Sequence, residues 1–152
     1  MDNIAFKYNS ATFHDILQHL NSCNNQFVPP LNTRISLEEY SLKIFEKAIK
    51  FEIWNNTKLI GLLAAYKNDE NKTLFITNVS VEENFTGKGF SNKLLENAIA
   101  YCENLELKNI KLEVNKNNTK AISLYNKFNF IKENENVDSI FLNYTIKIKD
   151  GK

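Results

Sequence analysis

The chain has 152 residues, of which 43% are hydrophobic and 24% are charged, and its formal net charge is +1 at pH 7. This size and balance predict one globular domain over residues 1–152 and exclude a disordered chain. The small net charge argues against a general nucleic-acid or membrane-surface binder, because such proteins carry a strong basic excess.

The N-terminal part of the chain predicts one strand followed by a helix. The strand is expected over residues 4–8, and Thr12 can cap the helix that follows. Apolar residues then recur at helical spacing, namely Phe13, Ile16, Leu17 and Leu20. His14 and His19 are five residues apart on this helix, so we expect them on different faces.

A second helix is predicted after a loop that contains Pro29-Pro30, because two prolines exclude a helix or strand interior. It should begin after Ser36, since residues 36–39 read Ser-Leu-Glu-Glu and have the capping-box pattern, and run towards Lys50. Ile35 and Tyr40 are placed to form the hydrophobic staple of this helix.

The middle of the chain predicts three strands. Residues 51–54 and 58–66 are predicted to form a hairpin with its turn at Asn55-Asn56, and residues 73–81 are predicted to form the next strand. In that strand the apolar side chains change phase, from even positions to odd positions. They are Leu74 and Ile76, then Val79 and Val81. Such a change predicts a β-bulge near Thr77-Asn78.

The C-terminal half predicts a helix, a strand, a second helix and a final hairpin. The first helix has an apolar stripe formed by Phe90, Leu94, Leu95, Ala98, Ile99, Cys102 and Leu105. A buried strand follows at residues 109–114, and Asn118 can cap the next helix. Alternating apolar residues at the end indicate a strand with Ile140, Leu142, Tyr144, Ile146 and Ile148 on one face. The order β-α-α-β-β-β-α-β-α-β-β predicts an α/β protein with a mixed, mostly antiparallel sheet, a bulged central strand and helices on both faces.

Two of the four glycines, Gly87 and Gly89, stand between the bulged strand and the helix that follows it. Backbone N–H groups and the helix dipole at such a turn favour a phosphate group. The P-loop pattern fails, because Glu82 and Gly89 occupy positions where it needs a glycine and a Ser or Thr. The dinucleotide-binding pattern also fails, because Asn92 stands where its third glycine belongs.

Two separated motifs fit a different family. The first is Thr86-Gly87-Lys88-Gly89-Phe90-Ser91, and the second consists of Asn118, Ala121, Leu124, Tyr125, Lys127 and Phe130. With these motifs, residues 73–130 resemble the GNAT family of acetyl-CoA-dependent N-acetyltransferases. Thr86 stands where that family usually has Arg or Gln, and Asn129 replaces a glycine. The residues before position 73 match the family only in the order of their elements.

The resemblance implies that an amine attacks the thioester of acetyl-CoA directly. It implies a carbonyl-polarising donor at the backbone N–H of Val79 and a proton donor at the Tyr125 hydroxyl. The cofactor-binding residues that it implies are Val79, Val81, Thr86, Gly87, Lys88, Gly89, Phe90, Ser91, Asn118 and Tyr125. Two readings of the general base stay open, a water held by Asn78 or the carboxylate of Glu113. Tyr125 could instead be only a core aromatic, and Asn118 only a helix cap.

Arg34 is the only arginine of the chain and lies between the first two helices. Its planar fork suits an anionic group of an acceptor, while the simpler alternative is a surface ion pair with Glu38 or Glu39. The expected function is transfer of an acetyl group to a primary amine of a small molecule. A protein N-terminal or lysine acetyltransferase, and an acyl-CoA-binding module without turnover, are the alternatives.

The remaining features predict where such a protein works. Cys23 and Cys102 are far apart in sequence and indicate free thiols in a reducing compartment, so we expect a cytoplasmic protein. The first residues lack a signal-peptide pattern, and no apolar run reaches the length of a membrane span. No ligand spacing predicts a metal, no nucleic acid or membrane partner is expected, and homodimerisation is left open.

Overall fold

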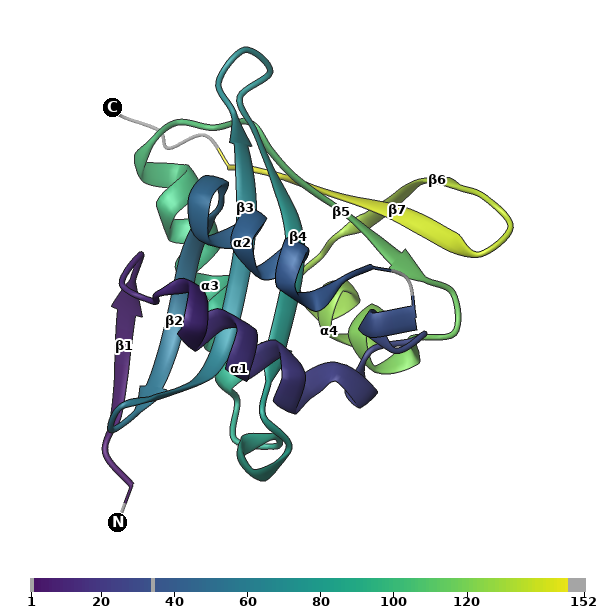
Figure 1. Ribbon diagram of the computed structural model, residues 1–152. Helices are drawn as coiled ribbons and strands as arrows, with labels where there is room; N and C mark the ends of the chain where they lie inside the picture. The colour runs from purple at the N-terminus through teal and green to yellow at the C-terminus, as the bar shows by residue number, and fades with distance from the viewer. Residues whose placement is uncertain (1, 34, 148–152) are drawn as a thin grey trace.

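A seven-stranded sheet with helices on both faces forms the protein, as the computed structural model of residues 2–33 and 35–147 shows (Figure 1). The strand order is β1-β2-β3-β4-β5-β7-β6, and only the β4–β5 pair is parallel. The elements in chain order are β1 (Ile4–Tyr8), α1 (Phe13–Cys23), α2 (Leu37–Lys47), β2 (Ile49–Asn55), β3 (Lys58–Asn68), β4 (Thr73–Val81), α3 (Phe90–Asn104), β5 (Asn109–Asn115), α4 (Thr119–Lys127), β6 (Ile131–Glu135) and β7 (Ser139–Thr145). The predicted order of elements and the mixed α/β class are confirmed.

Both predicted N-caps of the first two helices are present. The Thr12 hydroxyl accepts a hydrogen bond from the Asp15 backbone N–H over 3.1 Å, and the Asp15 carboxylate accepts one from the Thr12 N–H over 2.9 Å. The Ser36 hydroxyl accepts from the Glu39 N–H over 3.2 Å. Such caps satisfy backbone donors that a helix start leaves unpaired.

Helix α2 ends at Lys47, so the prediction that it continues towards Lys50 was wrong. Ala48 has extended backbone angles, and β2 begins at the next residue because it pairs there with β3. The Lys50 ammonium donates a hydrogen bond to the Ala48 carbonyl over 2.9 Å and contacts the last carbonyls of the helix. Lys50 therefore caps the C-terminus of α2 from the following strand.

The β-bulge predicted in β4 lies at Thr77. Asn78 pairs with Ala64 of β3 and Ile76 pairs with Ala65, so Thr77 is the extra residue. Apolar side chains from both sides of the bulge consequently share one core cluster, and they are Leu74, Ile76, Val79 and Val81. Asn78 and Ser80 face the opposite side of the sheet, where α1 packs, as the contacts of Ser80 show.

The sheet separates two cores. Helices α3 and α4 cover one face through Leu94, Leu95, Ala98, Cys102 and Tyr125, while α1 and α2 cover the other through Ile16, Leu20 and Ile44. Cys102 is fully buried, as expected for a core residue. Leu105 was wrongly assigned to the buried stripe: it is 47% exposed, because α3 ends at Asn104. Ile148 lies outside the described residues.

A buried carboxylate anchors the start of α1. Glu52, on β2, is 1% exposed and accepts hydrogen bonds from the Ser10 N–H, the Ser10 hydroxyl, the Ala11 N–H and the Trp54 indole at 2.6–3.0 Å. Because a buried charge needs such donors, these contacts hold the turn before α1 against the sheet. Over residues 2–33 and 35–147, no helix has the length and apolarity needed to cross a membrane.

Candidate active site

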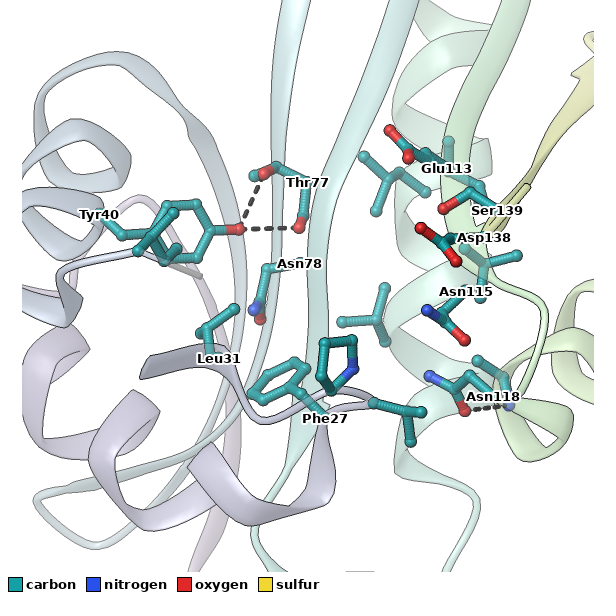
Figure 2. A pocket seen from close by; sticks show the side chains of 18 of the residues that line it. Phe27, Leu31, Tyr40, Thr77, Asn78, Glu113, Asn115, Asn118, Asp138 and Ser139 are labelled. Carbon is teal, nitrogen blue, oxygen red and sulfur yellow. Dashed lines mark hydrogen bonds between the residues drawn. The ribbon is translucent and has the colours of Figure 1, made fainter. Parts of the chain in front are cut away.

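A cleft opens where β4 and β5 separate. The two strands pair in parallel only over Thr73–Ile76 and Asn109–Leu112, and beyond the bulge they diverge (Figure 1). The cleft between them has a volume of about 1430 Å³. Figure 2 shows Thr77 and Asn78 on one wall, with Glu113, Asn115 and Asp138 on the other. The bulge and the early end of the parallel pairing thus create the opening.

Five of the predicted site residues line this cleft. They come from β4, β5 and α4 and are Asn78, Val79, Glu113, Asn118 and Tyr125. The remaining walls are formed by α2, by the loop between β6 and β7, and by residues before α2, namely Phe27, Val28, Pro29, Leu31, Ile35 and Ser36. The fold therefore brings together residues that are up to 47 positions apart in sequence (78 to 125).

Tyr125 contributes a buried phenol to the cleft. The residue is 6% exposed, and its ring packs against Phe130 with ring centroids 5.4 Å apart. Burial raises the pKa of the Tyr125 hydroxyl above its usual value, because the charged phenolate is poorly solvated there. The hydroxyl therefore keeps its proton at neutral pH and can donate it or a hydrogen bond.

Asn118 and Glu113 differ in how firmly they are held. The Asn118 side-chain oxygen accepts a hydrogen bond from the Ala121 N–H over 3.2 Å, so the predicted cap of α4 is confirmed (Figure 2). Glu113 has an exposed side chain and lies on β5 opposite Phe141 of β7. Its carboxylate is solvated, while the amide of Asn78 on the facing wall is 4% exposed.

The glycine turn, residues 86–91, lies at the start of α3. Gly87 and Gly89 have φ angles of +78° and +80°, a region that L side chains rarely adopt. A Cβ atom on either would meet nothing within 4 Å, so the turn leaves open space in front of both. The Thr86 hydroxyl donates to the Glu83 carbonyl over 2.8 Å.

The remaining predicted cofactor residues lie away from the cleft lining. Lys88, Gly89 and Phe90 border a smaller hollow of about 340 Å³ together with Lys93 and others. Val81 is buried in the core, and Thr86, Gly87 and Ser91 line neither opening.

Arg34 lies outside the described residues, so its predicted role stays a prediction. Across residues 2–33 and 35–147, no group of three or more His, Cys, Asp or Glu side chains is placed to hold a metal ion.

Two polar connections at the bulge were not predicted from the sequence. The Tyr40 hydroxyl on α2 reaches Thr77, and the buried His19 on α1 reaches Ser80, which contacts Asn78. The partners are 37 and 61 residues apart, so no local pattern marks them. The only signal was the placement of His19 on a different helix face from His14, which is confirmed: His14 is exposed and His19 is buried.

Comparisons with known proteins agree with this architecture. The sequence model of the Acetyltransferase (GNAT) family matches residues 13–130. A search among curated proteins finds no match to the chain. The two sequence motifs support a resemblance over residues 73–130. The family match extends it towards the N-terminus, to residue 13.

Solved structures of similar fold include several N-acetyltransferases. The ribosomal-protein-S18-alanine N-acetyltransferase of Escherichia coli is 18% identical, with a TM-score of 0.71 and coverage of 99% of this chain and 97% of that one. The PaiA N-acetyltransferase of Thermoplasma acidophilum, in complex with coenzyme A, is 12% identical, with a TM-score of 0.72 and coverage of 93% and 99%. A chimeric spermidine N-acetyltransferase derived partly from Vibrio cholerae is 21% identical, with a TM-score of 0.73 and coverage of 93% and 95%.

These structures share the fold, while the family itself is established by the match to its sequence model over most of the chain. The chain therefore belongs to the acetyltransferase (GNAT) family and is an acyltransferase.

Proposed function

We propose that the protein transfers the acetyl group of acetyl-CoA to the primary amine of a small molecule. The observation that carries this proposal is the cleft between β4 and β5, which is lined by the bulge of β4 on one side and by Tyr125 on the other. Its volume of about 1430 Å³ exceeds that of an ordinary small-ligand pocket, so it has room for an acyl donor and an acceptor together.

The glycine turn fits the pyrophosphate of coenzyme A. Its two left-handed glycines leave space in front of the backbone, and the turn leads into the N-terminus of the 15-residue helix α3. Backbone N–H groups at a helix start favour a negatively charged group. Lys88 lies at the adjacent hollow and adds positive charge, while Lys93 at the same hollow is paired with Glu96 over 3.6 Å. Thr86 supplies no long side-chain donor, so we expect binding that is weakened rather than lost.

The proposed reaction forms a C–N bond and breaks a C–S bond. The acceptor amine attacks the thioester carbonyl carbon, and the Val79 backbone N–H stabilises the negative charge that develops on the carbonyl oxygen. An ammonium acceptor first gives one proton to a water held by Asn78 or to the carboxylate of Glu113. Tyr125 donates its proton to the departing sulfur, and the second proton of the attacking nitrogen, lost as the amide forms, passes through water and restores the Tyr125 hydroxyl.

A free phenol is a weaker acid than a free thiol, and burial raises the pKa of the Tyr125 hydroxyl further. Tyr125 therefore acts by donating its proton to the sulfur while the C–S bond breaks, when the charge on the sulfur is still developing.

The acceptor has two candidate classes. The similar structures include enzymes named for a ribosomal-protein alanine and for spermidine. A protein acceptor is therefore the second candidate, and the exposed loop between β6 and β7 that lines the cleft favours it, since Val137 in this loop is 88% exposed.

One assay separates these candidates. Release of free thiol from acetyl-CoA is followed with a panel of spermidine, amino acids, an aminosugar and peptides with a free N-terminus. Turnover with a small amine supports the proposal, and turnover only with peptides supports the second candidate. Acetyl-CoA binding measured by calorimetry without turnover on any amine of the panel would reject both candidates.

A further inference from the structure

Three buried polar side chains connect the interior of the protein to the cleft. His19 on α1, Ser80 on β4 and Asn78 at the bulge are 1%, 7% and 4% exposed. His19 Nδ1 lies 3.2 Å from the Leu59 carbonyl oxygen, and its Nε2 lies 2.9 Å from Ser80 Oγ. Ser80 Oγ lies 2.8 Å from the side-chain atom of Asn78 that is placed as Oδ1, and Asn78 lines the cleft. The hydrogen-bonding chemistry of His19 and its partners favours the opposite orientation of this amide.

The direction begins at Leu59. A carbonyl oxygen only accepts hydrogen bonds, so Nδ1 of His19 must carry a proton to make the 3.2 Å contact favourable. Burial lowers the pKa of His19 to about 4, so the ring is neutral at physiological pH and has one N–H group. Nε2 is then the unprotonated nitrogen and accepts a hydrogen bond from Ser80.

Ser80 has a single hydroxyl proton, which it donates in a hydrogen bond to Nε2 of His19. The oxygen of Ser80 can then only accept from Asn78, so the atom placed as Oδ1 at 2.8 Å is assigned as the Nδ2–H₂ group instead. The oxygen and nitrogen of an amide differ by a half-turn of the side chain and are assigned through their hydrogen bonds. This half-turn directs Oδ1 of Asn78 away from Ser80.

Cys23 and the Ser80 backbone carbonyl are the other polar groups beside the ring. The Cys23 sulfur lies 3.7 Å from Nε2 and 4.0 Å from Nδ1 of His19. Burial raises the pKa of the Cys23 thiol to about 12, so it stays neutral. A neutral thiol is a weak donor and a weak acceptor, and it does not outweigh the contacts of Leu59 and Ser80.

We propose that His19 and Ser80 fix the Asn78 amide with its oxygen toward the cleft, where it accepts a hydrogen bond from the amine to be acetylated. His19 and Ser80 are positioning residues, and Asn78 contacts the substrate. The role toward the amine rests on the proposed function, whereas the orientation of the amide does not.

A fixed amide matters because its two ends act oppositely on an amine. An ammonium or amine N–H is a donor, so it bonds to Oδ1 and is opposed by Nδ2–H₂. Without Ser80 the amide can turn, and the fraction of molecules that present an acceptor falls. The buried chain also holds the oxygen in place before the substrate arrives, so no ordering is needed at the moment of binding.

The orientation can be tested without any substrate. Long-range ¹H–¹⁵N NMR of the histidine rings reports which nitrogen carries the proton, with the exposed His14 as an internal reference. We expect the Nδ1–H tautomer for His19 at pH 7. An Nε2–H tautomer would require Ser80 to donate to Asn78 and would overturn the proposal.

The Asn78→Asp variant reverses the chain. A carboxylate only accepts, so Ser80 must donate to it and can then only accept from Nε2–H of His19. Since Nδ1 still faces the Leu59 carbonyl, both ring nitrogens become protonated, and the pKa of His19 rises. We expect an imidazolium signal at pH values where the wild-type ring is neutral. An unchanged His19 signal in a folded variant would show that Asn78 and His19 are not coupled.

Kinetics test the role toward the amine. With the best acceptor from the amine panel, Ser80→Ala should raise the acceptor KM about tenfold or more and leave the acetyl-CoA KM unchanged. Ser80→Thr keeps the hydroxyl and should restore most of the acceptor affinity; if Ser80→Ala does not fold, Ser80→Thr and the NMR experiment still decide. Equal acceptor KM values for Ser80→Ala and wild type would show that the orientation of Asn78 does not contribute to acceptor binding. Wild-type protein inactive on the whole panel would refute the proposed function and leave the NMR result standing.

Discussion

The Tyr40 hydroxyl on α2 donates a hydrogen bond over 2.7 Å to the backbone carbonyl of Thr77, the extra residue of the bulge in β4. The Thr77 side-chain hydroxyl lies equally close, at 2.7 Å, and can donate back to the Tyr40 oxygen (Figure 2). A bulge leaves backbone groups without ladder partners, and here a helix side chain satisfies one of them. Helix α2 thereby holds the wall of the cleft that Asn78 and Val79 also form.

Removal of this bond should affect both stability and activity. We expect Tyr40→Phe to lower the free energy of unfolding by about 1 kcal/mol, the usual net value of one hydrogen bond. A loosened bulge should also lower kcat/KM at least about tenfold, because small misplacements of reacting groups are costly. Tyr66→Phe is the matched control, since within the described residues the buried Tyr66 hydroxyl has no hydrogen-bond partner. Equal effects of the two variants would contradict the assignment.

Substitution of Gly89 should separate backbone strain from ligand contact. Gly89→Val places a β-branched residue at φ +80°, so it should destabilise the fold as well as block the cradle. Asn tolerates this conformation better, so Gly89→Asn should fold close to normally.

We expect Gly89→Asn to weaken coenzyme A binding at least tenfold, or ~1.4 kcal/mol, because its side chain fills the open space in front of the turn. Calorimetric titration measures the affinity, and thermal unfolding reports any strain. A folded variant with wild-type affinity would place the pyrophosphate elsewhere.

Loss of the Tyr125 hydroxyl should reduce the chemical step. General acid catalysis contributes roughly 10²–10⁴-fold, so Tyr125→Phe should lower kcat strongly while acetyl-CoA binding changes little. Tyr144→Phe is the control, because Tyr144 packs against the same Phe130 ring with centroids 5.4 Å apart but does not line the cleft. If kcat of Tyr125→Phe stays at the wild-type value, Tyr125 is only a core aromatic.

Burial of His19 predicts a pH dependence of stability. Its pKa in the folded chain is about 4, below the unfolded value of 6.5, so the unfolded state binds the proton first as the pH falls. The free energy of unfolding should therefore decrease between pH 7 and pH 4, by up to about 3 kcal/mol from this residue. The slope is measured by urea unfolding at each pH. His19→Gln should flatten it, whereas His14→Gln, on the exposed face of the same helix, should not.

The sequence predicted those parts of the structure that depend on local patterns. The bulge could be placed within a residue because two runs of apolar side chains in one strand differ in phase, and a core face permits only one phase. Thr12, Ser36 and Asn118 were identifiable as caps because capping needs only nearby backbone groups. The end of α2 was misjudged because the pairing of β2 with β3, which begins at Ile49, outweighs the helical propensity of the residues up to Lys50.

The cleft could not be predicted, because it results from pairs of elements that lie far apart in the chain. Its walls depend on where the parallel pairing of β4 and β5 stops. No residue in either strand indicates this position in the sequence. The contacts of Tyr40 with Thr77 and of His19 with Ser80 arise only after α1 and α2 have packed on the sheet. A resemblance to a family supplied Tyr125 and Val79, and the residues themselves would have left both as core.

The short parallel seam between β4 and β5 also has a mechanical consequence. It joins two halves of the sheet, β1 to β4 and β5 to β7, through the residue pairs from Thr73 with Asn109 to Ile76 with Leu112. Within each half the strands pair through antiparallel ladders, whereas the two halves pair only through this short seam. Any change in the angle between the halves is therefore concentrated at the seam. The width of the opening therefore depends on the geometry of this one seam. Mutations that alter the packing of α3 against it should change which acceptors fit without altering a residue that touches them.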